Sequence, residues 1–329
     1  MARRRNRERV ALAAAGALSA ALAAALPASS TAQAVASAVD GRRAISLDVT
    51  VCGSPSLPTR AAASAVRFTP GRGEAAAPWM AKLEMVERLG PDGAMTVSNC
   101  GGVAIDRDWL LTAGHCVGSA DWSSLRATLG VRDLEDSAAV RRRGAVALCP
   151  ARFDSTTLAH DLALVRLETP LPNGFPIVRL ATSREARALR PGGRALSAGW
   201  SRVEPQRLSQ TLRLAHVRVI DPGRAPDGVI VAGPERDESS LCVGESGGPL
   251  VANFGAGSAL VGVFSSVDAY RDRATGALIE LCSGFEARSY FTPVAAYRDW
   301  IGRAIAACEA DLARCLGPAT RPASLRVGE

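Results

Sequence analysis

The sequence predicts an all-β fold that ends in one α-helix. From about residue 68 to residue 301, short runs of β-prone residues alternate with glycine and proline, as in a β-sandwich or a β-barrel. Only the last segment has apolar residues at helical spacing. The chain has 329 residues, of which 47% are hydrophobic, so it can form one large domain or two small ones. The expected strands include 103–105, 162–167, 196–200, 216–220 and 260–264.

The first 34 residues have the pattern of a secretory signal peptide. Five arginines occur within the first nine residues, an Ala/Leu-rich run follows, and the sequence Ala-Gln-Ala at 32–34 is typical of a cleavage site. The alternative is a transmembrane anchor, which the short, alanine-rich run disfavours. We therefore expect a secreted protein, extracellular or periplasmic, that has no membrane attachment after the signal is removed.

Residues 35–67 form a candidate pro-segment or linker. An alternating stretch at 45–51 suits a short strand, and the following residues are rich in proline, serine and arginine, as in an exposed linker.

The charge and the metal-ligand content argue against nucleic acid and metal partners. The formal net charge is +7, but residues 1–34 contain five arginines and one glutamate, so only +3 remains on the mature chain. All eight cysteines lie beyond the signal, and in an exported chain an even number indicates disulfides. There is no Cys-x-x-Cys and there are three histidines, so we expect no metal ion and no cofactor.

Residues 306–329 comprise the end of the predicted helix, near Gly317, and a tail. The apolar stripe consists of residues 301, 305, 308, 312 and 315. On a continuous helix, Cys308 and Cys315 would lie about 10.5 Å apart along the axis, too far for a disulfide between them. Two arrangements remain open: these cysteines pair with Cys52 and Cys149, or the helix breaks and they form a local bridge.

Ser246 is the candidate nucleophile. It lies in Gly244-Glu-Ser-Gly-Gly248, where glycines allow a sharp turn and a close approach to a substrate, and where backbone N–H groups can face a developing oxyanion. Gly-x-Ser-x-Gly also marks the elbow of α/β-hydrolases, but that fold needs a histidine after the serine. All three histidines precede Ser246, which excludes a lipase or esterase of that fold.

Two further residues complete a nucleophilic site. His115 lies in Trp-Leu-Leu-Thr-Ala-Gly-His-Cys at 109–116, after an apolar strand, and Asp161 opens a second apolar strand. A serine nucleophile needs such a base and a group that orients it. We expect His160 to point away from Asp161 on its strand and His216 to lie in an ordinary strand, so both are structural.

These motifs together resemble the chymotrypsin/trypsin-like serine proteases, over roughly residues 68–305. The order His, Asp, Ser and the separations of 46 and 85 residues are those of that family. The resemblance implies two six-stranded Greek-key β-barrels with a C-terminal helix, in a secreted, bacterial-type endopeptidase. It also implies that His115 takes the proton of Ser246 and that Asp161 orients the imidazole, so that the reaction passes through an acyl-enzyme.

The resemblance assigns supporting roles as well. Gly244 and Ser246 would form the oxyanion hole, and Ser265 would support the buried aspartate. It implies disulfides that link Cys100 to Cys116 and Cys242 to Cys282, and a packing role for Trp200.

The resemblance places Ser240 at the base of the substrate pocket, where a trypsin has aspartate. Val267 and Ser289 occupy the wall positions where the family's open pockets have glycine. A neutral, narrowed pocket predicts cleavage after small apolar residues. An aromatic preference is the alternative, and Asp237 or Glu238 would reach the pocket if the loop differs.

One residue departs from the family pattern. The family has aspartate before the nucleophile, where it pairs with the α-amino group that zymogen cleavage creates, and this chain has Glu245. The usual activation sequence is absent, and the nearest candidate bond follows Arg67, with weaker ones after Arg60 and Arg72. Either the ammonium of Phe68 pairs with Glu245, or an internal arginine does so and there is no cleavage switch.

Two classes of function follow. The first is a monomeric endopeptidase that acts on proteins or peptides. The second is a catalytically silent homologue that serves as a binding protein.

Overall fold

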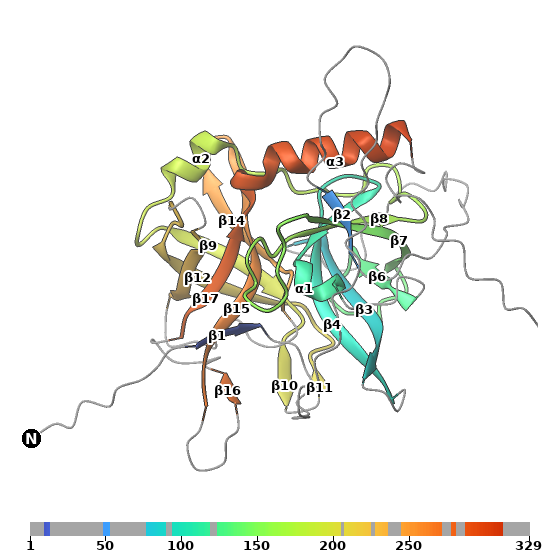
Figure 1. Ribbon diagram of the computed structural model, residues 1–329, viewed down its shortest axis with the longest axis horizontal. Coiled ribbons are helices and arrows are strands. Elements are labelled where there is room, and N and C mark those ends of the chain that lie inside the picture. Colours follow the sequence, from blue (N-terminus) through green and yellow to red (C-terminus); the bar gives the residue numbers. More distant parts are fainter. Residues whose placement is uncertain are drawn as a thin grey trace, which may run out of the picture.

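The computed structural model describes residues 10–13, 49–52, 77–89, 94–118, 124–204, 207–224, 228–235, 245–271, 278–280 and 287–311. Two antiparallel β-barrels stand side by side in these residues, and helix α3 (Arg298–Ala310) runs along the top of the view (Figure 1). This confirms the expected all-β fold with a C-terminal helix.

The first barrel has six strands in the order β7-β6-β3-β4-β5-β8, and pairing of β7 with β8 closes it. A short strand, β2 (Val49–Val51), extends this sheet by pairing with β7. The barrel strands are β3 (Met80–Leu89), β4 (Ala94–Ala104), β5 (Trp109–Thr112), β6 (Arg126–Leu129), β7 (Val140–Pro150) and β8 (Ala163–Leu167).

The second barrel has the order β15-β14-β9-β12-β13-β17 and is closed by β15 and β17. β1 (Val10–Ala13) and β16 (Leu278–Glu280) pair with β15, while β10 (Arg202–Glu204) and β11 (Arg207–Leu208) form a separate pair. The barrel strands are β9 (Arg194–Gly199), β12 (Arg213–Asp221), β13 (Ile230–Pro234), β14 (Pro249–Phe254), β15 (Gly257–Arg271) and β17 (Ser289–Pro293).

The five predicted strand runs fall in β4, β8, β9, β12 and β15. Apolar residues fill each barrel, and a third cluster lies where the barrels meet. Met80 of β3 packs there with Ala198 and Trp200, which confirms that Trp200 is a core residue. The two barrels are therefore held together by burial of apolar surface beside the strands that carry the site.

The C-terminal helix is shorter than the sequence predicts. Besides α3, the described helices are α1 (Gly114–Val117), α2 (Ser183–Ala188) and the 3₁₀-helix η2 (Val294–Tyr297). α3 buries Ile301, Ala304 and Cys308 and ends at Ala310, because Asp311 adopts an extended backbone. The expectation of a helix that ends near Gly317 is therefore wrong, and Leu312, Cys315 and the tail lie outside the described residues.

The disulfides exclude one of the two cysteine arrangements that the sequence left open. Cys52 bonds to Cys149, so neither is available to Cys308 or Cys315. Cys308 is itself disulfide-bonded, to a cysteine outside the described residues. The calculated separation of about 10.5 Å between Cys308 and Cys315 does not apply, because it required a helix that continues through residue 315.

None of the described helices is long and apolar enough to cross a membrane. The proposed signal peptide and pro-segment lie mostly outside the described residues, apart from β1 and 49–52.

Candidate active site

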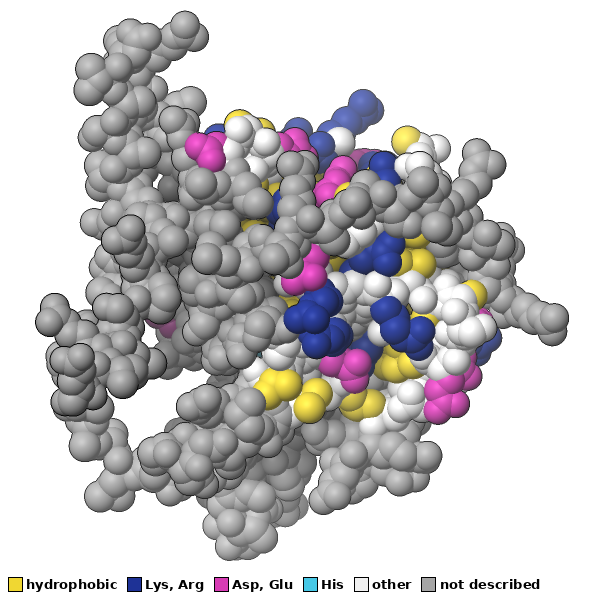
Figure 2. Space-filling view, turned by 90° about the vertical axis from the view of Figure 1, so that its right-hand side faces the viewer, with side chains coloured by type: hydrophobic (Ala, Val, Ile, Leu, Met, Phe, Trp, Pro, Cys, Tyr) yellow, Lys and Arg dark blue, Asp and Glu magenta, His cyan; other side chains and the backbone are white. Residues whose placement is uncertain are grey.

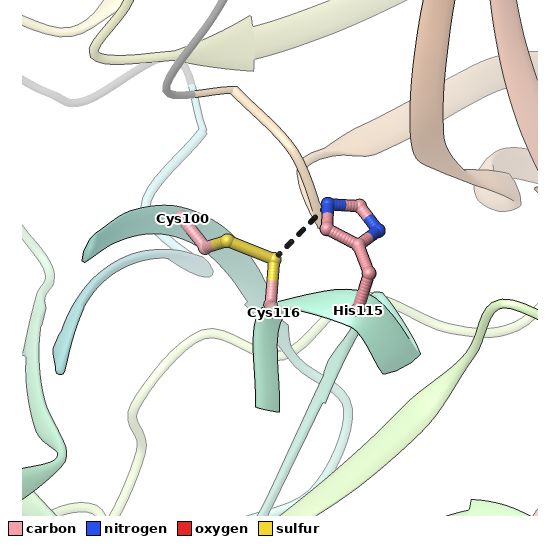
Figure 3. Close-up of side chains that lie close together, drawn as sticks. All are labelled: Cys100, His115 and Cys116. Atoms are coloured by element: carbon pink, nitrogen blue, oxygen red, sulfur yellow. Dashed lines mark hydrogen bonds between the residues drawn. A yellow bond between two sulfur atoms is a disulfide. The ribbon is translucent and has the colours of Figure 1, made fainter. Parts of the chain in front are cut away.

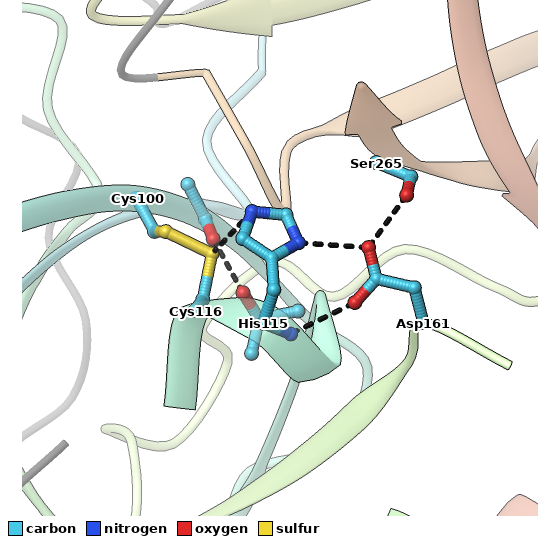
Figure 4. The surroundings of a disulfide bond; sticks show 7 residues. Cys100, His115, Cys116, Asp161 and Ser265 are labelled. Carbon is cyan, nitrogen blue, oxygen red and sulfur yellow. Dashed lines mark hydrogen bonds and ion pairs between the residues drawn. A yellow bond between two sulfur atoms is a disulfide. The ribbon is translucent and has the colours of Figure 1, made fainter. Parts of the chain in front are cut away.

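His115 and Asp161 lie next to each other in the first barrel. β5 ends at Thr112, and the short helix α1 that follows presents His115 toward the start of β8. One carboxylate oxygen of Asp161 lies 2.7 Å from His115 Nδ1, and the other accepts a 2.8 Å hydrogen bond from the backbone N–H of His115. Asp161 thus contacts both the ring and the backbone of His115 (Figure 4) and holds the imidazole in one orientation.

Asp161 is completely buried. Ser265 Oγ, from β15 of the second barrel, donates a 2.5 Å hydrogen bond to Asp161 Oδ2, and Thr292 Oγ1 donates to its carbonyl oxygen. A buried carboxylate is costly unless such donors satisfy it. Both barrels therefore contribute to the position of this acid.

Ser246 reaches the site from the second barrel, immediately before β14. Its carbonyl oxygen accepts a 2.6 Å hydrogen bond from the N–H of Gly101 in β4, and the N–H of Gly247 donates to the carbonyl of Phe264 in β15. Gly247 has a φ of +79°, and a Cβ there would lie 2.2 Å from Thr112 Oγ1. Glycine is required at this position because the turn packs directly on β5.

The hydroxyl of Ser246 is buried and has no hydrogen-bond partner among the described residues. The structure thus brings His115, Asp161 and Ser265 into direct contact, but it does not show a hydrogen bond between Ser246 and His115. In enzymes without a substrate, such bonds are often long and shorten only when the substrate binds.

A disulfide lies beside the histidine. Cys100 and Cys116 are bonded, as the resemblance implied, and Cys116 Sγ lies 3.8 Å from His115 Nε2 (Figure 3). The side-chain nitrogen and sulfur atoms of these three residues lie within 4.8 Å of one another, as the ligands of a metal ion would. Sulfurs that are joined to each other are not thiolates, so this cluster is a structural bridge.

The two other histidines lie elsewhere. His160 has a φ of +56° in a turn rather than on a strand, and its Nδ1 lies 2.8 Å from the hydroxyl of Tyr297. The expectation that His160 lies on a strand is therefore wrong, because the chain turns before β8 begins. His216 lies in β12 and is exposed.

Val267 and Ser289 face each other across β15 and β17. Both are buried, and Ser289 Oγ has no hydrogen-bond partner within the described ranges. Other predicted site residues, namely Ser240, Cys242, Gly244 and Cys282, lie outside the described residues, as do the candidate cleavage bonds.

Glu245, which precedes Ser246, is 4% exposed. Its side chain lies against Gly199, where a Cβ would come within 2.7 Å of Glu245 Cγ. Burial lowers the pKa of Lys82 in β3 to about 8, and the carboxylates of Glu84 and Glu245 act in the opposite direction. Sequence reasoning assigned no role to Lys82, although it is the only lysine of the chain.

Comparison with known proteins identifies relatives over most of the chain. The family model described as Trypsin matches residues 67–301. The chain is 29% identical to human cathepsin G over 54% of this chain and 69% of that protein. It is 28% identical to trypsin iota of Drosophila melanogaster, over 69% of this chain and 83% of that protein. It is 27% identical to chymase of Cavia porcellus, over 70% and 86%.

Proposed function

This chain belongs to the trypsin family of serine endopeptidases, and we propose that His115, Asp161 and Ser246 form its catalytic triad. The observation that carries the proposal is the buried Asp161, which accepts hydrogen bonds from the backbone of His115 and from Ser265 and lies against the imidazole. A carboxylate fixed in this way keeps one ring nitrogen protonated and leaves Nε2 free to act as a base.

In the proposed reaction, His115 Nε2 removes the proton of Ser246 Oγ while that oxygen attacks the scissile carbonyl carbon. The imidazolium then donates this proton to the leaving amine, the C–N bond breaks, and an acyl-enzyme remains. Water, deprotonated by His115, hydrolyses the ester and restores Ser246. The N–H groups of Gly244 and Ser246 stabilise the oxyanion, and each such donor contributes about 3 kcal/mol.

A fluorophosphonate probe tests this proposal, because it reacts only with an activated serine. We expect the secreted protein to be labelled at Ser246 and the Ser246→Ala variant to remain unlabelled. A Ser183→Ala variant, which removes an exposed hydroxyl at the start of α2, is the control and should be labelled normally. A folded protein that fails to label, even after limited proteolysis, would instead be a catalytically silent homologue that serves as a binding protein.

For specificity, we propose cleavage after small apolar residues. Val267 and Ser289 are buried opposite each other, which supports a narrow pocket, and Ser240 would give it a neutral base. The edge of β15 accepts an extended antiparallel segment, as β1 does at Ser266–Ala269, so a peptide substrate can pair there. Chromogenic peptides that end in Ala, Phe or Arg distinguish the alternatives, and preferential cleavage after Arg would contradict this proposal.

For activation, two proposals stand. Cleavage after Arg67 would free the ammonium of Phe68 to pair with Glu245, or an internal arginine would already pair with Glu245 and no cleavage switch would exist. Sequencing the N-terminus of the active form decides between them, since a start well upstream of Phe68 excludes the first.

We further propose a monomeric enzyme that is secreted by means of residues 1–34 and that binds no nucleic acid. The relatives' family, the disulfides and the signal-like N-terminus support secretion. On the face toward the first barrel, basic side chains are interspersed with acidic ones (Figure 2), which does not favour a polyanion.

A further inference from the structure

His160, directly before Asp161, is a histidine for which the proposed mechanism has no use. Its Nδ1 lies 2.8 Å from the hydroxyl of Tyr297, and the two rings meet edge to face with their centres 6.2 Å apart. Tyr297 is the last residue of η2 and directly precedes α3. The hydrogen bond therefore connects the residue before the proposed catalytic acid to the C-terminal part of the fold.

The backbone at His160 adopts a left-handed conformation, which is uncommon for a residue with a side chain. Its φ is +56°. The N–H of Leu162 donates a 2.8 Å hydrogen bond to the carbonyl of His160, so Asp161 lies at the centre of a three-residue turn. Such a conformation persists only where the surrounding structure holds it. The direction in which Asp161 projects therefore depends on the contacts that His160 makes.

The loop before this turn is held by its own hydrogen bonds. The N–H of Asp154 donates to the carbonyl of Ala159, and the carboxylate of Asp154 accepts from the N–H groups of Thr156 and Thr157. These bonds close the loop as far as Ala159. The next side chain, that of His160, then contacts Tyr297, so the loop and the tyrosine hold the turn from its two sides.

The C-terminal segment contacts the turn twice. Thr292 Oγ1 of β17 donates a 2.8 Å hydrogen bond to the carbonyl oxygen of Asp161, and Tyr297, further along the chain, contacts His160. Tyr297 packs against the apolar core of the first barrel and lies edge to face with the buried Trp300 of α3, at 6.5 Å between ring centres. Because packing holds the ring, its hydroxyl is a fixed partner for the imidazole of His160.

We propose that His160 is a positioning residue: its hydrogen bond to Tyr297 fixes the turn that carries Asp161 and thereby keeps the carboxylate against Nδ1 of His115. Catalysis is sensitive to such support, because misplacement of a catalytic group by about 1 Å can lower the rate by about 100-fold. The sequence assigned His160 no more than a structural role. This inference rests on the proposed function of His115 and Asp161.

The first test observes the contact between His115 and Asp161 without any use of activity. In protein labelled with ¹⁵N-histidine, the proton on His115 Nδ1 gives a low-field resonance because a carboxylate accepts it, and its loss in His115→Ala assigns it. We expect this resonance to move upfield in Tyr297→Phe, which removes the hydroxyl and keeps the ring. Thr156→Ala, an exposed change in the same loop, is the control and should leave the resonance in place.

The second test measures steady-state kinetics on the best peptide substrate. We expect Tyr297→Phe to lower kcat by about fivefold, the factor that corresponds to one ordinary hydrogen bond, with KM unchanged. His160→Gly removes the imidazole and adopts a positive φ without strain. Because the effects of paired residues are not additive, Tyr297→Phe should have little further effect on kcat in a His160→Gly background.

The outcomes separate this inference from the proposed function. An unchanged His115 resonance in Tyr297→Phe would overturn the positioning role, and so would an undiminished loss of kcat from Tyr297→Phe in the His160→Gly background. A protein that shows no Ser246-dependent hydrolysis in any form would instead defeat the proposed function, and the resonance would still decide the role of His160. If His160→Gly does not fold, the resonance in wild type and Tyr297→Phe remains decisive.

Discussion

At the scale of single residues, the site depends on buried charges that are matched by specific partners. Asp161 is satisfied by His115 and Ser265, all at hydrogen-bond distance. Lys82 is different, because its ammonium is buried with only electrostatic support from two glutamates. Asp161 therefore orients the imidazole of His115, whereas burial of the Lys82 ammonium lowers the free energy of unfolding by an amount that depends on pH.

Replacement of Asp161 by Asn should reduce kcat by about 10⁴-fold, the loss that the equivalent change causes in a trypsin-like protease, because an amide favours the wrong tautomer of the imidazole. Steady-state kinetics on the best peptide substrate measures this loss. Ser265→Ala removes one donor and should cost less than Asp161→Asn. A rise in KM with an unchanged kcat would indicate that Asp161 supports substrate binding rather than the base.

The stability of the protein should depend on the protonation of Lys82. Its pKa falls from 10.5 to about 8 on folding. Below pH 8 both states are protonated and the folded state bears the full cost of the buried ammonium. Between pH 8 and 10.5 the unfolded state binds more protons, so the free energy of unfolding rises with pH.

We therefore expect the free energy of unfolding of wild type to rise by about 2 kcal/mol relative to Lys82→Met between pH 7 and pH 9.5. Urea denaturation of both proteins at each pH measures the difference, and other titrating groups cancel in the comparison. Parallel curves for the two proteins would show that the lysine keeps its ordinary pKa.

At the scale of elements, the short helix α2 illustrates how local sequence determines a boundary. Thr182 accepts a hydrogen bond from the N–H of Glu185, and Glu185 in turn accepts one from the N–H of Thr182, which is a capping box. Arg179 donates two hydrogen bonds to the same carboxylate, and this contact lowers the pKa of Glu185 to about 2.

Thr182→Ala should lower the free energy of unfolding by about 1 kcal/mol, because it removes the side-chain acceptor at the helix start. The adjacent Ser183→Ala change is the control, since Ser183 is exposed and does not cap. Equal losses in the two variants, measured by urea denaturation, would show that the cap contributes nothing.

At the scale of the whole molecule, the Cys52–Cys149 disulfide joins the proposed pro-segment to the first barrel. It links residues 97 positions apart, beside the pairing of β2 with β7. Closing a loop of this length stabilises the folded state by about 4 to 5 kcal/mol in the chain-entropy model. The segment around Cys52 is thus a covalent part of the barrel.

Cleavage after Arg67 should therefore not release the fragment that contains β2. On a denaturing gel, the cut protein should keep its full mass without reductant and lose the fragment when reductant is added. A Cys52→Ser/Cys149→Ser variant should lose it under both conditions. Release of the fragment from the wild-type protein without reductant would show that this bond is absent.

Much of the fold and part of the site were predictable from sequence, for identifiable reasons. Strand runs such as 162–167 alternate with turn residues, so local pattern locates them. The end of α3 was not predictable, because the apolar stripe continues past Asp311 although the backbone there is extended. The left-handed turn at His160, the disulfide partner of Cys52 and the burial of Lys82 were not predictable either, since each depends on contacts with residues distant in the chain.

By itself, the sequence determined the family of this protein, because the order of His115, Asp161 and Ser246 and the glycines around the serine match one kind of candidate nucleophilic site. Such motifs are short and local, so they can be recognised in the sequence without knowledge of how the rest of the chain folds. Only the tertiary structure decided that Asp161 is buried against Ser265, that Cys52 bonds to Cys149, and that the sole lysine lies buried where the charge of Glu245 acts on it. Those facts depend on which distant strands pair and on which charged side chains are buried away from solvent. Neither can be inferred from a local sequence pattern.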